Sequence, residues 1–217
     1  FTASSSEMFS GALKDYNRGL IVGESTFGKG TVQNLIDLER FFPNSSMQFG
    51  QLKITLAKYY RVNGGSTQKI GIEPHIEFPN IYDRSIYTEN SRENALDWDK
   101  IRDVSHTNIN YVTKPLVDHL TTTFDYDVKN DSSFINYMTF IDDTRKNREK
   151  KSISLNYSQR MNEKKDNDSR SNSLNTTVKI SEIFPIEEEN LLKKIKNDLY
   201  LRESVKLFIE MLSFKES

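Results

Sequence analysis

The sequence predicts an α/β piece followed by a mainly helical piece, and two observations carry this prediction. All nine glycines of the 217-residue chain lie at or before Gly71, and glycine supplies the tight turns and positive φ angles that sheet-containing cores need. Charged side chains become denser at the same point, with 15 in residues 1–79 and 46 in residues 80–217. We therefore expect a domain at 1–79, a linker at 80–94 and a helical domain at 95–217.

The first piece opens with a helix. Apolar side chains recur at helical spacing over residues 5–16, and the serines at positions 4–6 include candidates for its N-cap. β-rich or extended patterns follow, because short apolar or alternating runs are bounded by Gly, Pro and Asn. These patterns lie at residues 20–22, 31–38 (strand or helix), 52–62 and 70–78.

The second piece is dominated by helical patterns. Helices are expected at about 111–126, 133–148, 186–197 and 202–212, with Asp131 as a cap for the second. Residues 152–157 alternate briefly, like a strand. Residues 163–177 are polar and lack periodicity, so we expect a disordered insert there.

Composition excludes several classes of protein. The chain has no cysteine, which excludes disulfide scaffolds, thiolate zinc sites and cysteine proteases. Its formal net charge of -1 argues against a strongly basic nucleic-acid binder. No apolar run approaches the ~18 residues of a membrane span. We expect neither a metal nor a cofactor.

Hydrolytic chemistry would need a hydroxyl nucleophile, a base and donors for the developing oxyanion. The three histidines, His75, His106 and His119, lie in no recognisable motif and are expected to be structural. The remaining base is Lys29, which has Gly28 and Gly30 on either side. A lysine works as a general base near neutral pH only where burial lowers its pKa from about 10.4 toward ~7–8. Spacing alone favours a solvated lysine in a turn.

The same residues permit a second interpretation. The segment from Gly23 to Gly30 nearly matches the phosphate-binding pattern G-x-x-x-x-G-K-[ST] and follows a short apolar run. It departs from the pattern at Gly30, where a hydroxyl would bind magnesium, and Thr31 comes one residue late. Nucleotide binding is therefore kept as a weaker alternative.

Four motifs in order resemble the C-terminal processing peptidases, which are serine proteases with a Ser-Lys dyad. The match is closest to the tail-specific group of Gram-negative bacteria, and it extends past residue 94 into the helical piece. The family's serine motif reads T/S-A-S-A-S-E, from which this chain departs mildly at Ser5. The motifs are TASSSE at 2–7, TFGKGTVQ at 26–33, YYRVNGGSTQ at 59–68 and GIEPHI at 71–76.

The resemblance implies roles for five residues. Ser4 would be the nucleophile, and Lys29, 25 positions later, would be its base. Gln33 would help to position the lysine, and Asp15 would have a supporting role. The N–H of Ser5 would be one donor of the oxyanion hole, at a helix N-terminus that favours negative charge.

The resemblance also implies a fold and a biological setting. Residues 1–79 would be the second half of a protease core, with a helix and a mixed β-sheet, followed by the helical C-terminal domain. The expected activity is endopeptidase cleavage of proteins recognised by apolar, unstructured C-terminal tails. A PDZ domain and the first half of the core would precede Phe1, so we expect this fragment to be inactive alone.

The expected compartment is the periplasm, with possible peripheral contact with the inner membrane. A lipoprotein adaptor is a possible partner by the same resemblance, and no nucleic-acid partner is expected. An alternative of a different class is a non-catalytic helical module that binds proteins.

Overall fold

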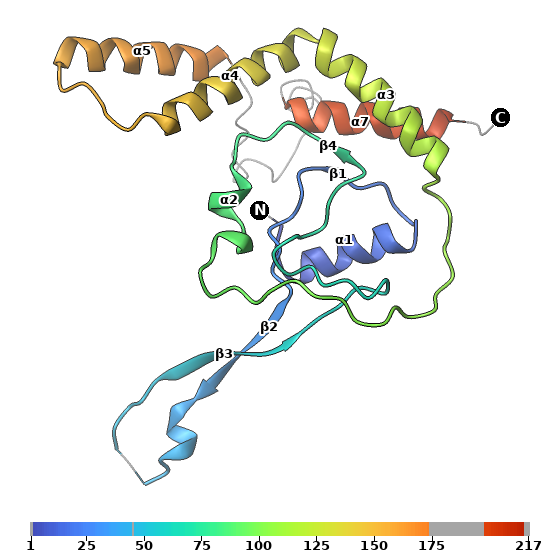
Figure 1. Cartoon of the computed structure of the whole chain (residues 1–217), viewed down its shortest axis with the longest axis vertical. Helices are drawn as coiled ribbons and strands as arrows, with labels where there is room; N and C mark the ends of the chain where they lie inside the picture. Colours follow the sequence, from blue (N-terminus) through green and yellow to red (C-terminus); the bar gives the residue numbers. More distant parts are fainter. Residues whose placement is uncertain (1, 45, 174–197, 215–217) are drawn as a thin grey trace, which may run out of the picture. The chain divides into compact units, whose positions relative to one another are not determined.

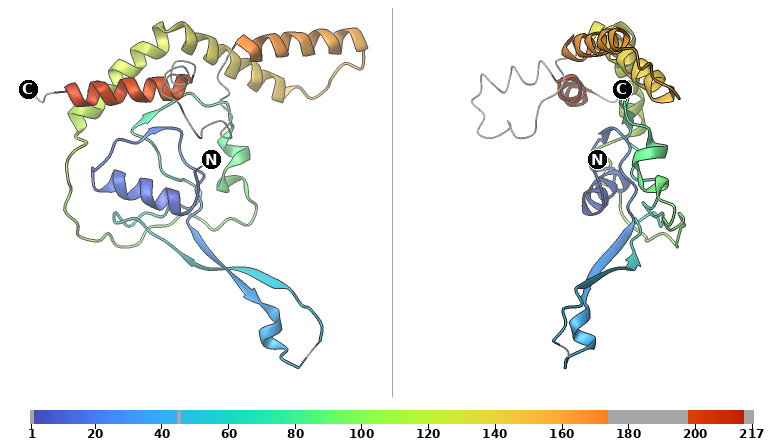
Figure 2. Two further views of the ribbon diagram at one scale, coloured as in Figure 1. Left: turned by 180° about the vertical axis from the view of Figure 1, so that it is seen from behind. Right: turned by 90° about the vertical axis from the view of Figure 1, so that its left-hand side faces the viewer.

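The computed structural model describes residues 2–44, 46–173 and 198–214 (Figures 1 and 2). Its contacts divide the chain into two compact units, residues 1–77 with 82–112 and residues 78–81 with 113–217. The first unit is mixed α and β and the second is helical, which agrees with the predicted fold class. Residues 82–112, which we expected to be divided between a linker and the helical domain, pack into the first unit.

The first unit contains two small sheets. Strands β1 and β4 are parallel, with Val22 opposite Ile76. Strands β2 and β3 are antiparallel and form a separate sheet. In chain order the elements are α1 (Ser5–Asp15), β1 (Val22–Gly23), β2 (Thr31–Asp37), η1 (Leu38–Phe41), β3 (Gln51–Lys58), β4 (Ile76–Glu77), α2 (Arg84–Tyr87) and η2 (Glu89–Ser91).

The β2–β3 pair forms a long twisted ribbon that extends away from the rest of its unit (Figures 1 and 2). Its register places Asn34 opposite Ile54 and Ile36 opposite Leu52. A bulge between Val32 and Gln33 shifts the pairing, and bulges of this kind re-aim side chains near functional sites. Residues 31–37 are therefore a strand, whereas the sequence alone was compatible with either a strand or a helix there.

The first unit has a small apolar core around Ile72 and Ile76, both almost completely buried. Helix α1 approaches this core through Gly11, where an added Cβ would lie 3.0 Å from Ile72 Cδ1. Of the expected extended segment at 70–78, only Ile76–Glu77 pairs as a strand. Pro74 has no N–H to donate, which limits ladder formation beside it.

In its described residues the second unit contains helices α3 (Lys114–Asn130), α4 (Ser132–Glu149), α5 (Tyr157–Ser173) and α7 (Leu199–Ser213). The helices expected at 133–148 and 202–212 are confirmed. The helix expected at 111–126 starts later, after Thr113, whose hydroxyl caps it. Asp131 caps α4 as predicted, accepting from Ser133 N at 2.6 Å. None of the described helices is both long and apolar enough to cross a membrane.

Aromatic stacking organises the core of the second unit. Phe78 stacks on Phe124 and Tyr200, with centroid distances of 4.8 and 5.3 Å. Phe134 meets Phe124 edge-on at 5.6 Å. Helices α3 and α7, which carry Phe124 and Tyr200, lie side by side (Figure 1). The other buried apolar side chains of this unit are Leu116, Leu120, Tyr137, Ile141, Leu199 and Leu207.

Two expectations for the second unit differ from the structure. Residues 152–156 are irregular rather than a strand, and α5 begins at Tyr157. This helix continues to Ser173, over most of the segment expected to be disordered. Arg160 pairs with Glu163 one turn on at 2.6 Å, and most of the good helix formers of the segment, Gln159, Arg160, Met161, Glu163, Lys164 and Lys165, lie in the first half of this helix. Residues 174–177, and the helix expected at 186–197, lie outside the described residues.

Candidate active site

Ser4 is the N-cap of α1 and has an unusual backbone conformation. Its φ of 57° and ψ of -118° lie in a region that side-chain-bearing residues rarely occupy, and such strain costs about 1–3 kcal/mol. Its carbonyl oxygen accepts from Glu7 N and Met8 N at 2.9 and 3.1 Å. Its own N–H donates to Glu7 Oε2 at 2.8 Å. Strain held by surrounding bonds in this way is typical of functional sites, including nucleophiles at sharp turns before helices.

Ser5 is the first residue of α1. Its N–H therefore belongs to the first-turn amides that have no intrahelical acceptor. The helix dipole adds partial positive charge at this end. An oxyanion beside Ser4 would thus meet a favourable electrostatic environment.

The carboxylate of Glu7 connects α1 with residues 26–30, which are called the lysine loop below. Oε2, which binds Ser4 N, also accepts from Lys29 N at 2.9 Å. Oε1 accepts from Gly28 N at 2.6 Å and from the hydroxyl of Thr26. Glu7 is completely buried, so four donors replace the water that its charge has lost. In the sequence Glu7 is visible only as the last residue of the TASSSE motif, and no role was expected for it.

The lysine loop can approach its neighbours only because it contains two glycines. Gly28 has a φ of 92°, and an added Cβ would lie 2.8 Å from the carbonyl carbon of Lys69. At Gly30 an added Cβ would lie 2.7 Å from Gln68 N. These contacts are with backbone, so neither neighbour can move aside as a flexible side chain would. The two glycines that flank Lys29 are therefore needed for a steric reason, since a side chain at either position would clash with neighbouring backbone.

A cavity of about 600 Å³ opens beside Lys29. Lys29, Thr31 and Gln33 alternate along the chain and line one side of it. Gln33 lies on β2, and its Nε2 is 3.5 Å from Thr55 Oγ1. Residues 89 and 92–96 also line the cavity. The structure therefore brings Lys29 and Gln33 to one cavity.

Ser4 and Lys29 are joined through their main chains. In the part of the chain that the structure describes, no hydrogen bond joins Ser4 Oγ to Lys29 Nζ, and none joins Lys29 to the Gln33 side chain. The connection runs through the shared oxygen of Glu7. Four of the five predicted residues therefore lie near one another: Ser4, Ser5 and Lys29 around the Glu7 carboxylate, and Lys29 and Gln33 at the cavity. The fifth, Asp15, lies elsewhere.

Asp15 lies at the opposite end of α1, about 16 Å from Ser4 along the helix axis at 1.5 Å per residue. Its carboxylate accepts from Arg61 Nε at 2.8 Å and also pairs with Arg61 Nη2. Asn63 Nδ2 donates to the same group at 3.1 Å. The side chain is only 6% exposed. Asp15 therefore fastens the end of α1 to the turn after β3 and does not reach Ser4.

The histidines have structural contacts away from Ser4. His75 Nδ1 accepts from Ile21 N at 2.9 Å, and burial lowers the pKa of this half-buried imidazole. His106 Nδ1 lies 2.9 Å from the carbonyl oxygen of Val104, and His119 pairs with Glu210 at 2.8 Å. The described residues contain no group of three or more His, Cys, Asp or Glu placed to hold a metal ion.

The structure contradicts the phosphate-loop interpretation of residues 23–30. A phosphate loop leads into a helix, whose N-terminal amides bind the anion, but Lys29 leads into strand β2. The amides of Gly28 and Lys29 already donate to the carboxylate of Glu7. A phosphate would meet a negative charge where it needs donors.

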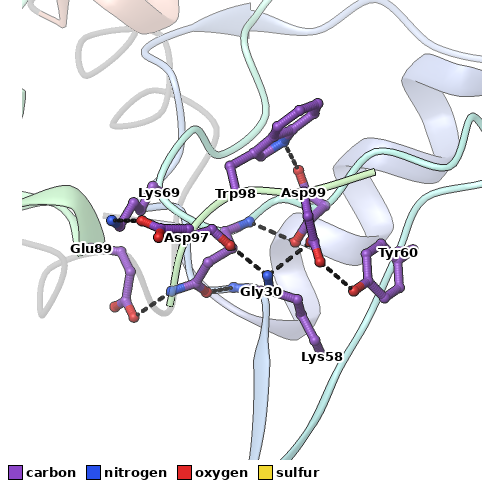
Figure 3. A network of polar contacts seen from close by, with 10 residues as sticks. Gly30, Lys58, Tyr60, Lys69, Glu89, Asp97, Trp98 and Asp99 are labelled. Carbon is purple, nitrogen blue, oxygen red and sulfur yellow. Dashed lines mark hydrogen bonds and ion pairs between the residues drawn. The ribbon is translucent and has the colours of Figure 1, made fainter. Parts of the chain in front are cut away.

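The segment after η2 is bound to Lys58 at the end of β3 and to the residues that follow it (Figure 3). Asp99 accepts from Lys58 Nζ at 2.8 Å and from the Tyr60 hydroxyl at 3.1 Å. Lys69 Nζ donates to Asp97 at 2.6 Å, and Trp98 Nε1 donates to the carbonyl oxygen of Ser66 at 2.8 Å. These bonds explain why residues 82–112 belong to the first unit.

Comparisons with known families divide the chain in two. Residues 1–78 match Peptidase family S41, and residues 82–213 match the family described as C-terminal domain of tail specific protease. The two matches correspond to the two pieces seen in the sequence, although residues 82–112 pack with the first.

Individual relatives agree with this division. The tail-specific protease of Haemophilus influenzae is 36% identical over 99% of this chain, which spans 32% of that relative. A chloroplastic C-terminal processing peptidase of Tetradesmus obliquus is 42% identical over 35% of this chain and 15% of its own length. A carboxy-terminal-processing protease of Bartonella bacilliformis is 44% identical over the same shares. The chain therefore belongs to the tail-specific proteases, joining part of a family S41 peptidase domain to the C-terminal domain of that group.

Proposed function

We propose that this chain is the catalytic and C-terminal part of a serine endopeptidase with a Ser4–Lys29 dyad. The observation that carries the proposal is the single Glu7 oxygen that accepts the N–H groups of both Ser4 and Lys29. A buried carboxylate shared in this way fixes two residues far apart in sequence around one point. The strained backbone of Ser4 supports the same assignment.

The reaction proceeds through an acyl-enzyme. Lys29 Nζ takes the proton of Ser4 Oγ as Oγ bonds to the scissile carbonyl carbon, and the N–H of Ser5 stabilises the oxyanion. The C–N bond then breaks, and Lys29 returns the proton to the leaving amine. Water attacks the ester, Lys29 takes its proton, and Ser4 Oγ recovers a proton as it leaves.

The proposed substrates are proteins with apolar, unstructured C-terminal tails, and the proposed compartment is the periplasm. The relatives' names support cleavage at or directed by C-termini. A PDZ domain in the full-length protein, a lipoprotein adaptor and peripheral membrane contact belong to the same proposal. We also propose that residues 1–217 are inactive alone, because one wall of the site and one oxyanion donor would come from elsewhere in the full-length protein.

The test uses the full-length protein and an unfolded protein substrate with an apolar tail. Ser4→Ala and Lys29→Ala should each abolish cleavage. Lys29→Arg should also fail, because a guanidinium stays protonated and cannot act as a base. The control is Lys53→Arg on β3, where the charge is exposed. Cleavage by Lys29→Arg at the wild-type rate would remove the lysine from the mechanism, whereas cleavage by Ser4→Ala would reject the nucleophile.

The non-catalytic alternative, a helical module that binds proteins, predicts a different result. The wild-type full-length protein would then leave the substrate uncleaved, and Ser4→Ala and Lys29→Ala would not change this result. The same assay therefore separates the two functions.

A further inference from the structure

The hydroxyl of Tyr59 lies between the carbonyl oxygens of the two proposed catalytic residues. Its oxygen is 2.7 Å from the carbonyl oxygen of Lys29 and 3.1 Å from that of Ser4. Tyr59 directly follows β3, and its N–H donates to the carbonyl oxygen of Gly30 at 3.0 Å. One half-buried side chain thus contacts the main chain of both halves of the site.

Tyr59 complements Glu7. Glu7 accepts the N–H groups of Ser4 and Lys29 on one oxygen, whereas Tyr59 donates toward their carbonyl groups. A phenol has one proton, so the two carbonyl oxygens share a single donor. Both backbone groups of each residue are then held, and the separation of Ser4 Oγ and Lys29 Nζ depends only on side-chain torsions.

The hydroxyl is suited to remain a donor. Burial raises the pKa of Tyr59, and the negative charge of Glu7 raises it further, while the neighbouring Thr67 opposes the shift. The phenol therefore keeps its proton over the neutral range.

We infer that Tyr59 is a positioning residue for the Ser4–Lys29 pair. It acts through the main chain of the two residues and does not need to touch substrate. The inference rests on the proposed function. It predicts that loss of the hydroxyl slows the chemical step and leaves substrate binding unchanged, because effective proximity falls steeply when reacting groups are misplaced.

Tyr60 provides a matched control. It is the adjacent tyrosine, but its hydroxyl donates to Asp99 Oδ2 at 3.1 Å and has no bond to Ser4 or Lys29. Both Tyr59→Phe and Tyr60→Phe remove one hydroxyl from the same turn. A general weakening of that turn would therefore affect both variants.

The experiment measures kcat and KM of the full-length protein on an unfolded substrate with an apolar tail. We expect Tyr59→Phe to lower kcat by about ten- to a hundred-fold with KM within twofold, and Tyr60→Phe to keep kcat within twofold. The single-turnover acylation rate should fall with kcat. Thermal unfolding of each variant shows whether it is folded at the assay temperature.

Three outcomes overturn the inference: a wild-type kcat in Tyr59→Phe, a change confined to KM, or equal losses in both tyrosine variants. Should Tyr59→Phe be unfolded at the assay temperature, all variants are measured at a lower temperature at which Tyr59→Phe is folded. A wild-type kcat in the folded Tyr59→Phe at that temperature rejects the inference, and a kcat lowered at unchanged KM supports it. Ser4→Ala and Lys29→Ala are assayed in parallel. Activity in those variants would reject the proposed function itself, whereas their inactivity beside a fully active Tyr59→Phe would reject only the role of Tyr59.

Discussion

The side-chain oxygen of Gln68 accepts a hydrogen bond from the N–H of Gly30 at 2.8 Å and thereby fixes the residue that follows Lys29. Gln68 is completely buried. Its Nε2 donates to Glu89 Oε1 at 3.0 Å. A chain of bonds thus connects the lysine loop, through a buried amide, to the segment that lines the cavity beside Lys29 (Figure 3).

Gly30→Ala should disrupt this connection. The new Cβ would lie 2.7 Å from Gln68 N and 2.9 Å from Ser66 Oγ, and overpacking against backbone costs about 1–3 kcal/mol. We expect the free energy of unfolding to fall by that amount, and cleavage to fall by at least tenfold. Denaturant unfolding and activity of the full-length protein measure the two effects.

Gly19→Ala is the control for this prediction. Its Cβ would meet only Leu13 atoms at 3.6–3.8 Å, an ordinary contact. Equal effects of the two substitutions would contradict a special role for the close approach at Gly30.

Glu7→Gln should damage the site more than the fold. An amide has one acceptor oxygen, so it cannot serve the donors on both Oε1 and Oε2, and its NH2 group would face N–H donors. We expect a loss of about 2 kcal/mol in stability and a loss of cleavage of at least a hundredfold. Glu73→Gln, at an exposed acid, is the control. A Glu7→Gln variant with wild-type cleavage would show that the carboxylate is not needed to place Ser4 and Lys29.

Asp15→Asn tests whether Asp15 has a structural or a catalytic role. Loss of its charge leaves the partly buried Arg61 guanidinium with a neutral partner, and breaking such a pair costs about 3 kcal/mol. We expect a lower Tm but a nearly normal kcat at a temperature where the variant is folded. Asp118→Asn, in an exposed pair with Lys114 at 2.5 Å, should change stability by less than about 1 kcal/mol. Loss of kcat in a folded Asp15→Asn variant would instead give Asp15 a direct part in catalysis.

The second unit should become less stable as the pH rises, because of Glu203 on α7. Burial is the main cause that raises the pKa of this carboxyl to about 7. The neighbouring carboxylate of Asp127 on α3 adds to the shift, while Lys206 and Arg202 oppose it. In the unfolded chain the pKa returns to the ordinary 4.5. The stability of the unit with an uncharged Glu203 is therefore fully present below about pH 4.5, where the carboxyl is protonated in both the folded and the unfolded chain. This stability is lost as the pH rises through about 7, because the buried carboxyl then ionises.

Glu203→Gln keeps this position neutral at every pH. We expect the Tm of the variant, relative to wild type, to be higher at pH 8 than at pH 5. Differential scanning calorimetry of the full-length protein measures this, with Glu149→Gln, at an exposed position, as the control. A difference between Glu203→Gln and wild type that does not change with pH would mean that Glu203 is already ionised in the folded protein at pH 5.

The sequence by itself determined the division into a glycine-containing α/β piece and a helical piece, and most of the helices. Helices α1, α4 and α7 were predictable because their apolar spacing and caps, such as Asp131, are local along the chain. The proposal of Ser4 and Lys29 came from the resemblance of four motifs to a family, because spacing alone favoured a solvated lysine in a turn. The role of Gly30 could be anticipated, because glycine marks close approach of the backbone.

The tertiary structure alone decided the strand at 31–37, the packing of residues 82–112 and the connections within the site. Ser4, Lys29 and Tyr59 meet through main-chain N–H and C=O groups, which every residue carries and which leave no mark in a sequence pattern. Their partners lie up to 55 positions apart, so no local periodicity encodes them. Helix α5 was not predicted because it has no apolar face, so the hydrophobic periodicity that marks the other helices is missing from its sequence.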